Sequence, residues 1–382
     1  MASDAKTTIL SGSKPKTKLP TISGTRPSLR NSQLLISTGI PSLDSTIGGG
    51  LPIGSIFLIE EDKYGFNAKI VLKYYMAEGI VVSQPVLIAS QDVLPSQLVS
   101  GLPAVIDDSQ ECIKSNEYTK TNTDEPMKIA WRYQNLKIVD PTPTGGQTFG
   151  HYYDLTKQMP QDLLKNANIK QWENNEETML NKNNKFKNAA YSDLLCTIAK
   201  SLDDGKHYIS EARDKETKIL RIAIHSLGSR LWLSDTEKDS NCDLVKFFYC
   251  FRALLRQSYA VGVVTVPVTN FDNTDNVIER LEHLSDIAIR LESFAGSSKE
   301  INPLFKDYHG LLHIKKLCAL NGLSHGSLQY RDLVFKLRRK KFLIEVLHLP
   351  PEFDDTTQRE QDESITSSIG CMSGSHKSAL DF

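Results

Sequence analysis

The sequence has no cysteines spaced as C-x-x-C, no long hydrophobic run and no excess of either charge. Its six cysteines lie mostly in apolar segments, which predicts a reduced intracellular protein without a cysteine metal site. The apolar runs are too short to span a bilayer, and the first thirty residues lack the apolar core of a signal peptide. With 45 basic and 46 acidic residues, the chain has no net charge that would attract it to a membrane or a nucleic acid. Any nucleic-acid contact must therefore be a local patch.

Composition predicts one α/β domain between two tails. Residues 1–22 are rich in Ser, Thr, Lys and Pro and are predicted to be disordered. Residues 23–351 carry the regular patterns of a domain, and residues 352–382 read as a flexible, acidic, Ser-rich tail. Within the domain, residues from about 106 to 188 are weakly patterned, which favours an irregular surface insertion.

Buried strands and amphipathic helices alternate along the domain. A strand at 55–59, a helix at 68–78 and a strand at 86–89 form the first such unit, and this succession predicts a parallel sheet. The later predicted elements are helices at 191–202, 243–259 and 273–284, strands at 219–224, 261–266, 286–291 and 310–314, and a C-terminal β-hairpin at 333–349.

Residues 37–69 resemble the opening segment of a RecA-type ATPase core, with Thr-Gly, Leu-Asp, a triple glycine, Leu-Pro-x-Gly and a buried strand in register. A RecA-type enzyme follows that strand with the Walker A loop G-x-x-x-x-G-K-[ST], whose glycines, lysine and hydroxyl hold phosphates and magnesium. Here the same frame places Glu61 and Phe66 at the glycines, Asn67 at the lysine and Ala68 at the hydroxyl. We therefore predict a RecA-like parallel-sheet core with helices on both faces and no Walker A motif.

Two further features of the sequence oppose nucleotide hydrolysis. Glu60, Glu61 and Asp62 place three carboxylates where a polyanion would lie. The central strand that should end in the Walker B carboxylate ends instead in His225 and Ser226, and His225 fits either a general base or a structural histidine. The sequence thus predicts no catalytic residue, no bound cofactor and no metal site.

Basic residues at turns and strand exits are the candidate RNA contacts. In RecA-like rings the loops that leave two central strands face the ring axis, and here these loops are 226–241 and 267–280. The turn of the C-terminal hairpin is a competing basic cluster, which fits a solvated turn equally well. Trp232 would either stack on a base or be buried. The candidates are Arg230, Lys238, Arg280, Arg338, Arg339, Lys340 and Lys341.

Longer stretches of the chain resemble the fourth-subunit family of the Elongator complex. The resemblance covers residues 23–351 and the extreme C-terminus and is weak in the Asn/Lys-rich insertion. The stretches that carry it are 24–31, the triple-glycine segment through 64, 73–79, 127–134, 149–154, 302–310, 347–351 and 380–382.

That resemblance implies a RecA-like subunit without a phosphate loop of its own. It implies a heterohexameric ring with the fifth and sixth subunits, two copies of each, that binds tRNA. The ring would serve the complex that modifies wobble uridines (U34) of tRNA, whose catalytic subcomplex comprises the first three subunits, in the cytoplasm and nucleus. Two alternatives stay open, a degenerate ATPase that works across subunit interfaces and a structural adaptor without RNA contact.

Overall fold

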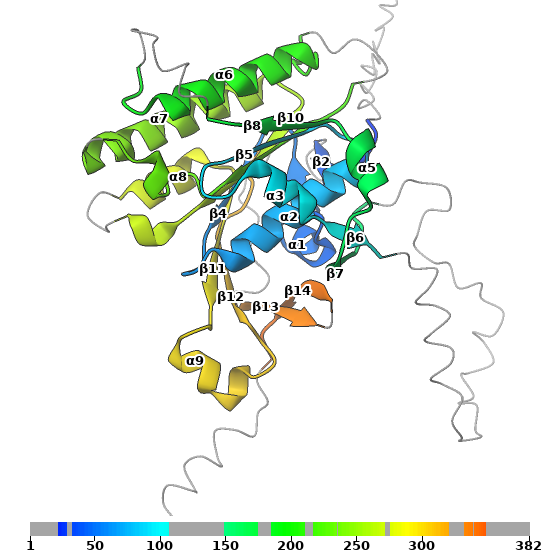
Figure 1. The fold of residues 1–382 in the computed structure, drawn as a ribbon. Coiled ribbons are helices and arrows are strands. Elements are labelled where there is room, and N and C mark those ends of the chain that lie inside the picture. The colour runs from blue at the N-terminus through cyan, green and yellow to red at the C-terminus, as the bar shows by residue number, and fades with distance from the viewer. Residues whose placement is uncertain are drawn as a thin grey trace, which may run out of the picture. The chain divides into compact units, whose positions relative to one another are not determined.

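The computed structural model describes residues 22–28, 33–106, 149–174, 185–210, 217–234, 236–271, 276–320, 332–338 and 340–348. A mixed sheet forms the centre of the fold (Figure 1). Among the described helices, none combines the length and the apolar character that crossing a membrane requires. The predicted disordered segment 1–22 lies outside the described residues except for Ile22, and the predicted tail 352–382 lies wholly outside them.

The main sheet has nine strands within the described residues, in the order β14-β13-β12-β11-β4-β10-β9-β5-β8. The six strands from β11 to β8 are parallel, and β12 and β13 continue the sheet in antiparallel pairing. The bounds are β4 Ile56–Glu60, β5 Val86–Ser90, β8 Ile169–Trp172, β9 Leu220–His225, β10 Ala260–Val266, β11 Ile287–Ser293, β12 Gly310–Lys316, β13 Leu333–Arg338 and β14 Lys341–Val346.

The order of the parallel strands confirms the RecA-like core. Counted along the chain, β4, β5, β9, β10 and β11 are the first to fifth core strands, and they lie in the order 5-1-4-3-2. This order places β4, the strand that precedes the phosphate-loop position, between β10 and β11. The carboxyl ends of β4, β9 and β10 therefore meet at one edge of the sheet, where α/β proteins place their ligand sites.

Helices cover both faces of the sheet, as the sequence predicts (Figure 1). Helices α6, α7 and α8 pack side by side on one face, and α2 and α3 lie on the other. Their bounds are α2 Phe66–Val81, α3 Pro95–Ser100, α6 Ala189–Asp204, α7 Glu237–Arg256 and α8 Val277–Leu284. Helix α7 begins six residues before the predicted start at 243, because Thr236 caps it by accepting a hydrogen bond from the Asp239 N–H.

An aromatic core lies between the sheet and helices α6 and α7. On α7 the spacing of the phenylalanines places Phe247 and Phe251 one turn apart on the buried face. Tyr191 of α6 packs against Phe247, with ring centroids 5.7 Å apart. Such burial contributes about 25 cal/mol for each Å² of apolar surface removed from water, which fixes the helices on the sheet and so fixes its edge.

A small antiparallel sheet precedes β4. It pairs β1 (Thr25–Pro27) with β2 (Leu34–Ile36), and β2 with β3 (Leu51–Pro52), and the short helix α1 (Pro41–Thr46) lies between β2 and β3. The triple glycine is needed here, since all three residues have positive φ, and a Cβ on Gly50 would come 2.5 Å from the Ile36 carbonyl oxygen.

The predicted irregular insertion contains regular structure. Strand β7 (Tyr153–Gln158) pairs with β6 (Pro103–Val105), which lies just before the insertion. Helix α5 (Gln161–Asn166) follows β7, and β8 joins β5 as a parallel edge strand. The expectation of irregularity across 106–188 is therefore corrected for its described part. The polar pattern of β8 hid it, because only Trp172 among its residues is buried.

The predicted C-terminal hairpin is confirmed, since β13 and β14 are hydrogen-bonded neighbours. The chain divides into a unit of residues 1–345 and a unit of residues 346–382. Of the second unit, the structure describes residues 346–348. The short helix α9 (Ser298–Ile301) lies between β11 and β12.

Candidate functional site: a closed phosphate-loop position

The first turn of α2 is bound by a carboxylate of the chain itself. Asp62, which is 4% exposed, accepts hydrogen bonds from the backbone N–H of Asn67 at 3.0 Å and of Ala68 at 3.4 Å. The Asn67 side-chain amide donates to the other carboxylate oxygen at 3.3 Å. The N–H groups at a helix N-terminus are those that bind phosphate in nucleotide-binding folds. Here Asp62 occupies them, and Gly65 permits the turn with a φ of 64°.

Glu61 fills the space between the ends of the central strands. Its carboxylate accepts hydrogen bonds from the Thr265 hydroxyl at 2.6 Å and from the Ser226 hydroxyl at 2.9 Å. Burial raises the pKa of Glu61, although these two hydroxyls act in the opposite direction. The side chain at the first glycine position of the RecA frame thus bridges β4, β9 and β10 instead of leaving room for a phosphate.

Glu60 adds a third buried carboxyl at the same edge. It is 1% exposed, burial raises its pKa to about 8, and the neighbouring Glu282 of α8 acts in the same direction. Glu60 Oε1 is buried without a hydrogen-bond partner in the described part of the chain, as fits a carboxyl that holds a proton near neutral pH. The three acidic side chains predicted at this position, Glu60, Glu61 and Asp62, are thus all buried.

The sequence frame places Phe66 at the second glycine of the phosphate loop, but its side chain is exposed and does not fill the phosphate position. Phe66 is the first residue of α2 and is 64% exposed, and Tyr64 beside it is 62% exposed. The group that meets the helix N–H donors is Asp62. Asn67 and Ala68 lie in the first turn of α2, which begins two residues before the predicted start at 68. Neither carries the positive charge or the hydroxyl of a Walker A loop.

His225 is buried beside a serine. Its Nδ1 lies 3.2 Å from the Ser90 hydroxyl, and that hydroxyl also accepts the Val93 N–H. Burial lowers the pKa of His225 to about 4, and the charge of Lys69 acts in the same direction. The imidazole is therefore neutral at pH 7 and lies within a packed network. Ser226, after β9, donates to Glu61, so the strand-end position that Walker B would take is built into the closed site.

A second polar cluster holds the segment that follows residue 148. Glu78 of α2 is 1% exposed, and it accepts hydrogen bonds from the Tyr153 hydroxyl at 2.6 Å and from the His151 backbone N–H at 3.1 Å. The His151 imidazole lies 3.1 Å from the same carboxylate. Burial raises the pKa of Glu78, but the His151 contact and the charge of Arg221 outweigh it and hold the pKa below its usual value.

Arg221 of β9 is absent from the predicted site residues, yet its guanidinium is fully buried. It donates to the Gln84 side chain at 2.7 Å and to the backbone carbonyls of Ser37 and Tyr75. The guanidinium also lies over the Tyr75 ring, 4.7 Å from its centroid. An arginine inside an otherwise apolar strand is the one signal that could have predicted this buried charge.

The predicted RNA-contact residues lie at four separate places. Arg230 is exposed on the 3-10 turn Arg230–Trp232 (η3) after β9. Lys238 is exposed but lies in the first turn of α7, not on a loop, with acidic residues on either side. Arg280 lies on α8, also not on a loop. Trp232 is buried and stacks on Trp172 with ring centroids 5.4 Å apart, so it is closed to base stacking.

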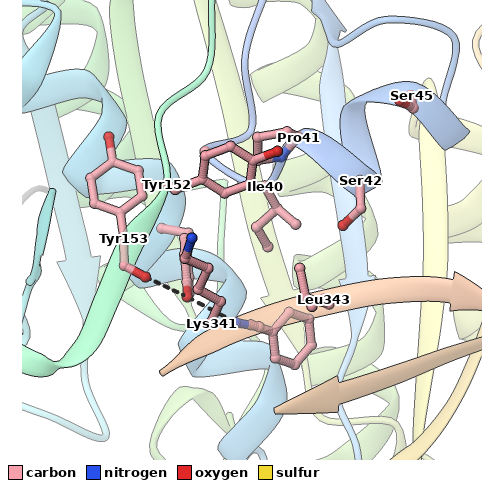
Figure 2. Close-up of a pocket in the computed structure, with 11 residues that line it drawn as sticks. Ile40, Pro41, Ser42, Ser45, Tyr152, Tyr153, Lys341 and Leu343 are labelled. Carbon is pink, nitrogen blue, oxygen red and sulfur yellow. Dashed lines mark hydrogen bonds between the residues drawn. The ribbon is translucent and has the colours of Figure 1, made fainter. Parts of the chain in front are cut away.

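The basic hairpin turn packs against the chain. The Lys340 ammonium lies 3.3 Å from the Asp154 carboxylate, and the Lys341 ammonium lies over the Tyr152 ring. Figure 2 shows Lys341 beside Tyr152 and Tyr153, in a pocket of about 230 Å³ that helix α1 also lines. Arg338 is exposed at the end of β13, and Arg339 lies outside the described residues.

Within the part of the chain that the structure describes, no group of three or more His, Cys, Asp or Glu side chains is arranged to hold a metal ion. Two arrangements surround α2. The buried carboxylates of Glu61 and Asp62 fill the phosphate-loop position, and hydrogen bonds join Glu78 to the segment at 151–153.

Comparison with known proteins identifies the family. The PAXNEB protein family model matches residues 18–382. The chain is 41% identical over 380 residues to Elongator complex protein 4 of Mus musculus, and the match covers 96% of this chain and 90% of that protein. The human protein of the same name is also 41% identical, with the same shares covered. The Dictyostelium discoideum protein is 32% identical over 88% of this chain and 78% of its own length.

A solved structure with a similar arrangement is a KaiC-like protein from Pyrococcus horikoshii OT3. It has a TM-score of 0.43 and 12% sequence identity, and the match covers 82% of this chain and 99% of that one.

The sequence matches cover nearly all of the chain at identities well above the level of chance. The chain therefore belongs to the PAXNEB family, together with the Elongator complex proteins 4 that it resembles.

Proposed function

We propose that the chain is a RecA-like accessory subunit of the Elongator complex whose own nucleotide position is closed. The relatives named Elongator complex protein 4 support the role in that complex. The observation that carries the closed site is the Asp62 carboxylate on the N–H groups of α2. A phosphate would have to displace a buried, hydrogen-bonded carboxylate and approach Glu61 as well. No lysine or hydroxyl at positions 67 and 68 would compensate for that cost.

The chain acts, in this proposal, as one of three kinds of subunit in a heterohexameric ring, with two copies each of the fifth and sixth Elongator subunits. The ring binds tRNA and supports U34 modification by the catalytic subcomplex of the first three subunits, in the cytoplasm and the nucleus. The exposed Arg230 and Lys238 support a tRNA contact, and the near-zero net charge means that few cations must supply it.

The test of assembly is co-expression with the fifth and sixth subunits, followed by native mass spectrometry. We expect one species with two copies of each chain, and a chain that is oligomeric or poorly soluble when expressed alone. A monodisperse monomer with no gain in thermal stability from those partners contradicts the ring.

The test of RNA binding uses the assembled ring and a tRNA in a filter-binding or fluorescence assay across salt concentrations. Binding that weakens steeply with salt is expected, since each phosphate contact releases counterions. A ring that assembles but shows no tRNA binding leaves the assembly proposal intact and refutes the RNA part.

A further inference from the structure

Helices α7 and α8 form an apolar groove on the face of the protein opposite to α2. Figure 1 shows the two helices adjacent on that face. The groove has a volume of about 500 Å³. It is lined by one side of α7 and the last turns of α8, namely Cys242, Val245, Lys246, Tyr249, Cys250, Arg280, His283 and Leu284.

The α7 side of the groove is a regular stripe that is exposed at Cys242, Lys246, Tyr249 and Cys250, while Val245 packs against the core. Positions 242, 245, 246, 249 and 250 repeat at intervals of three and four residues, which places them on one side of the helix. The buried phenylalanines of α7 lie on its other side, toward the sheet. Tyr249 is 68% exposed, and both cysteines are free and exposed. Packing against the core therefore explains Val245 but not the exposed Tyr249 and the two exposed cysteines.

The rim of the groove carries two permanently charged cations. Arg280 projects from α8 and Lys246 from α7, and none of the described residues that line the groove carries a carboxylate. Lys246 lies 3.5 Å from the buried Asp243, whose carboxylate also accepts two backbone N–H groups. Arg280 is exposed and forms no ion pair within the described part of the chain. An acidic occupant would therefore complement this rim.

The dimensions of the stripe select a helical occupant. From 242 to 250 the stripe spans nine residues of α7, and the eight steps between them cover about 12 Å at 1.5 Å per step. This is two helical turns, which matches anchors at i, i+3 or i+4, and i+7 of a helix that lies in a groove. A nucleic acid would instead need a row of cations along a polar surface, and the floor here is apolar.

We propose that this groove binds an acidic amphipathic helix supplied by a partner protein. Tyr249 is the main anchor, because an exposed aromatic ring offers a large apolar contact at low entropic cost. Arg280 and Lys246 position the acidic face of the bound helix. This inference does not depend on the closed nucleotide position or on RNA binding.

The experiment uses the full chain, alone and with its co-expressed partners, and a fluorescein-labelled peptide of about 15 residues. The peptide carries leucines at i, i+3 and i+7 and glutamates on its other face, and a second peptide carries lysines in place of the glutamates. We expect saturable binding of the acidic peptide only. Cys242 and Cys250 should then alkylate more slowly, while Cys196, exposed on α6, should react at an unchanged rate.

Variants locate the binding. Tyr249→Ala and Arg280→Glu should each lower the affinity for the acidic peptide by at least about tenfold. Lys200→Glu makes the same charge reversal at an exposed residue of α6 and should leave the affinity unchanged. Because all three side chains are exposed, each variant should fold, and circular dichroism checks that it does.

Four results of the peptide and RNA experiments overturn the proposal, and one result of ring assembly does so as well. They are no saturable binding, equal binding of the lysine peptide, an equal effect of the α6 variant, and slowed alkylation of Cys242 and Cys250 by an RNA duplex in place of the peptide. Slowed alkylation on ring assembly without any peptide also overturns it, because the groove is then an interface between ring subunits. A failure of ring assembly alone leaves it standing, since the peptide test does not require the ring.

Discussion

Replacing Asp62 with Ala removes the carboxylate that closes the phosphate position. The wild-type side chain accepts hydrogen bonds from two backbone N–H groups of α2 and from the Asn67 amide. These N–H groups lie at the end of a 16-residue helix, where the helix dipole favours a negative charge. Loss of the carboxylate leaves them without this acceptor.

The expected loss of stability can be worked from these contacts. Loss of a capping acceptor costs about 0.5–2 kcal/mol, and loss of a charge at the helix N-terminus costs about 0.3–1 kcal/mol. The repulsion between Asp62 and Glu61, which helps to raise the pKa of Glu61, offsets part of this. We expect the free energy of unfolding to fall by about 1–2 kcal/mol, or about 1.5–3 °C in Tm for a domain of roughly 330 residues.

The assay is thermal and urea unfolding of the full chain with its partners held at fixed concentration. Asp62→Asn keeps one oxygen acceptor and should lose about half as much stability, since only the charge is removed. Phe66→Ala is the control and should change stability by less than about 0.5 kcal/mol, because the ring is exposed. An Asp62→Ala variant as stable as wild type would show that the carboxylate does not hold α2, and the account of the closed site would then fail.

The remaining predictions concern buried carboxyls and surface cations. Glu78→Gln should lower the free energy of unfolding by about 1–3 kcal/mol at pH 7 and should reduce the acid-induced loss below pH 4.5, because the depressed pKa of Glu78 stabilises the fold only while the carboxyl is ionised. Wild type should lose stability as pH rises from 4.5 to about 8, because the raised pKa of Glu60 makes its ionisation in the folded state unfavourable. Glu60→Gln should abolish this loss, because the amide cannot ionise. If urea unfolding of the variant shows the same loss of stability over this pH range as wild type, the prediction is contradicted. Arg230→Ala with Lys238→Ala should weaken tRNA binding by the ring and lower the slope of log K against log salt by roughly 0.7–0.9 for each phosphate interaction that the substitutions remove, with Lys200→Ala unchanged as the control.

The core strands and helix α7 could be predicted from sequence, because the burial of these elements fixes where their apolar residues must lie. The strands of the core are continuous apolar runs, since parallel strands are covered on both faces, and predicted and observed bounds agree closely for β4, β5, β9 and β10. Helix α7 is recognisable from its aromatic spacing. Its predicted start is wrong because the first turn is polar and is defined by the Thr236 cap, not by burial.

Short or polar elements could not be predicted in the same way. Strand β8 buries a single residue, and β1–β3 are two or three residues long, so neither shows a readable period. The prediction that Lys238 lies on a loop is wrong for the same reason that the predicted start of α7 is late.

The candidate site was predictable in its composition and not in its mechanism of closure. The absence of glycine, lysine and hydroxyl at positions 61, 66, 67 and 68 is plain in the sequence. That Asp62 would bind the N–H groups of α2, with Phe66 exposed, depends on the turn geometry at Gly65. The groove of α7 and α8 was hidden as well, because its stripe of Cys, Val and Tyr has the composition of a buried helix face.

Isothermal titration calorimetry of ATP with magnesium against the purified full chain tests the central claim most directly. Asp62 fills the phosphate position, so no heat of binding should appear up to millimolar ATP, and Asp62→Ala should not create a site, because Asn67 and Ala68 supply neither lysine nor hydroxyl. Micromolar ATP affinity in the wild-type chain, abolished by substitution at Asn67 or Ala68, would contradict the account.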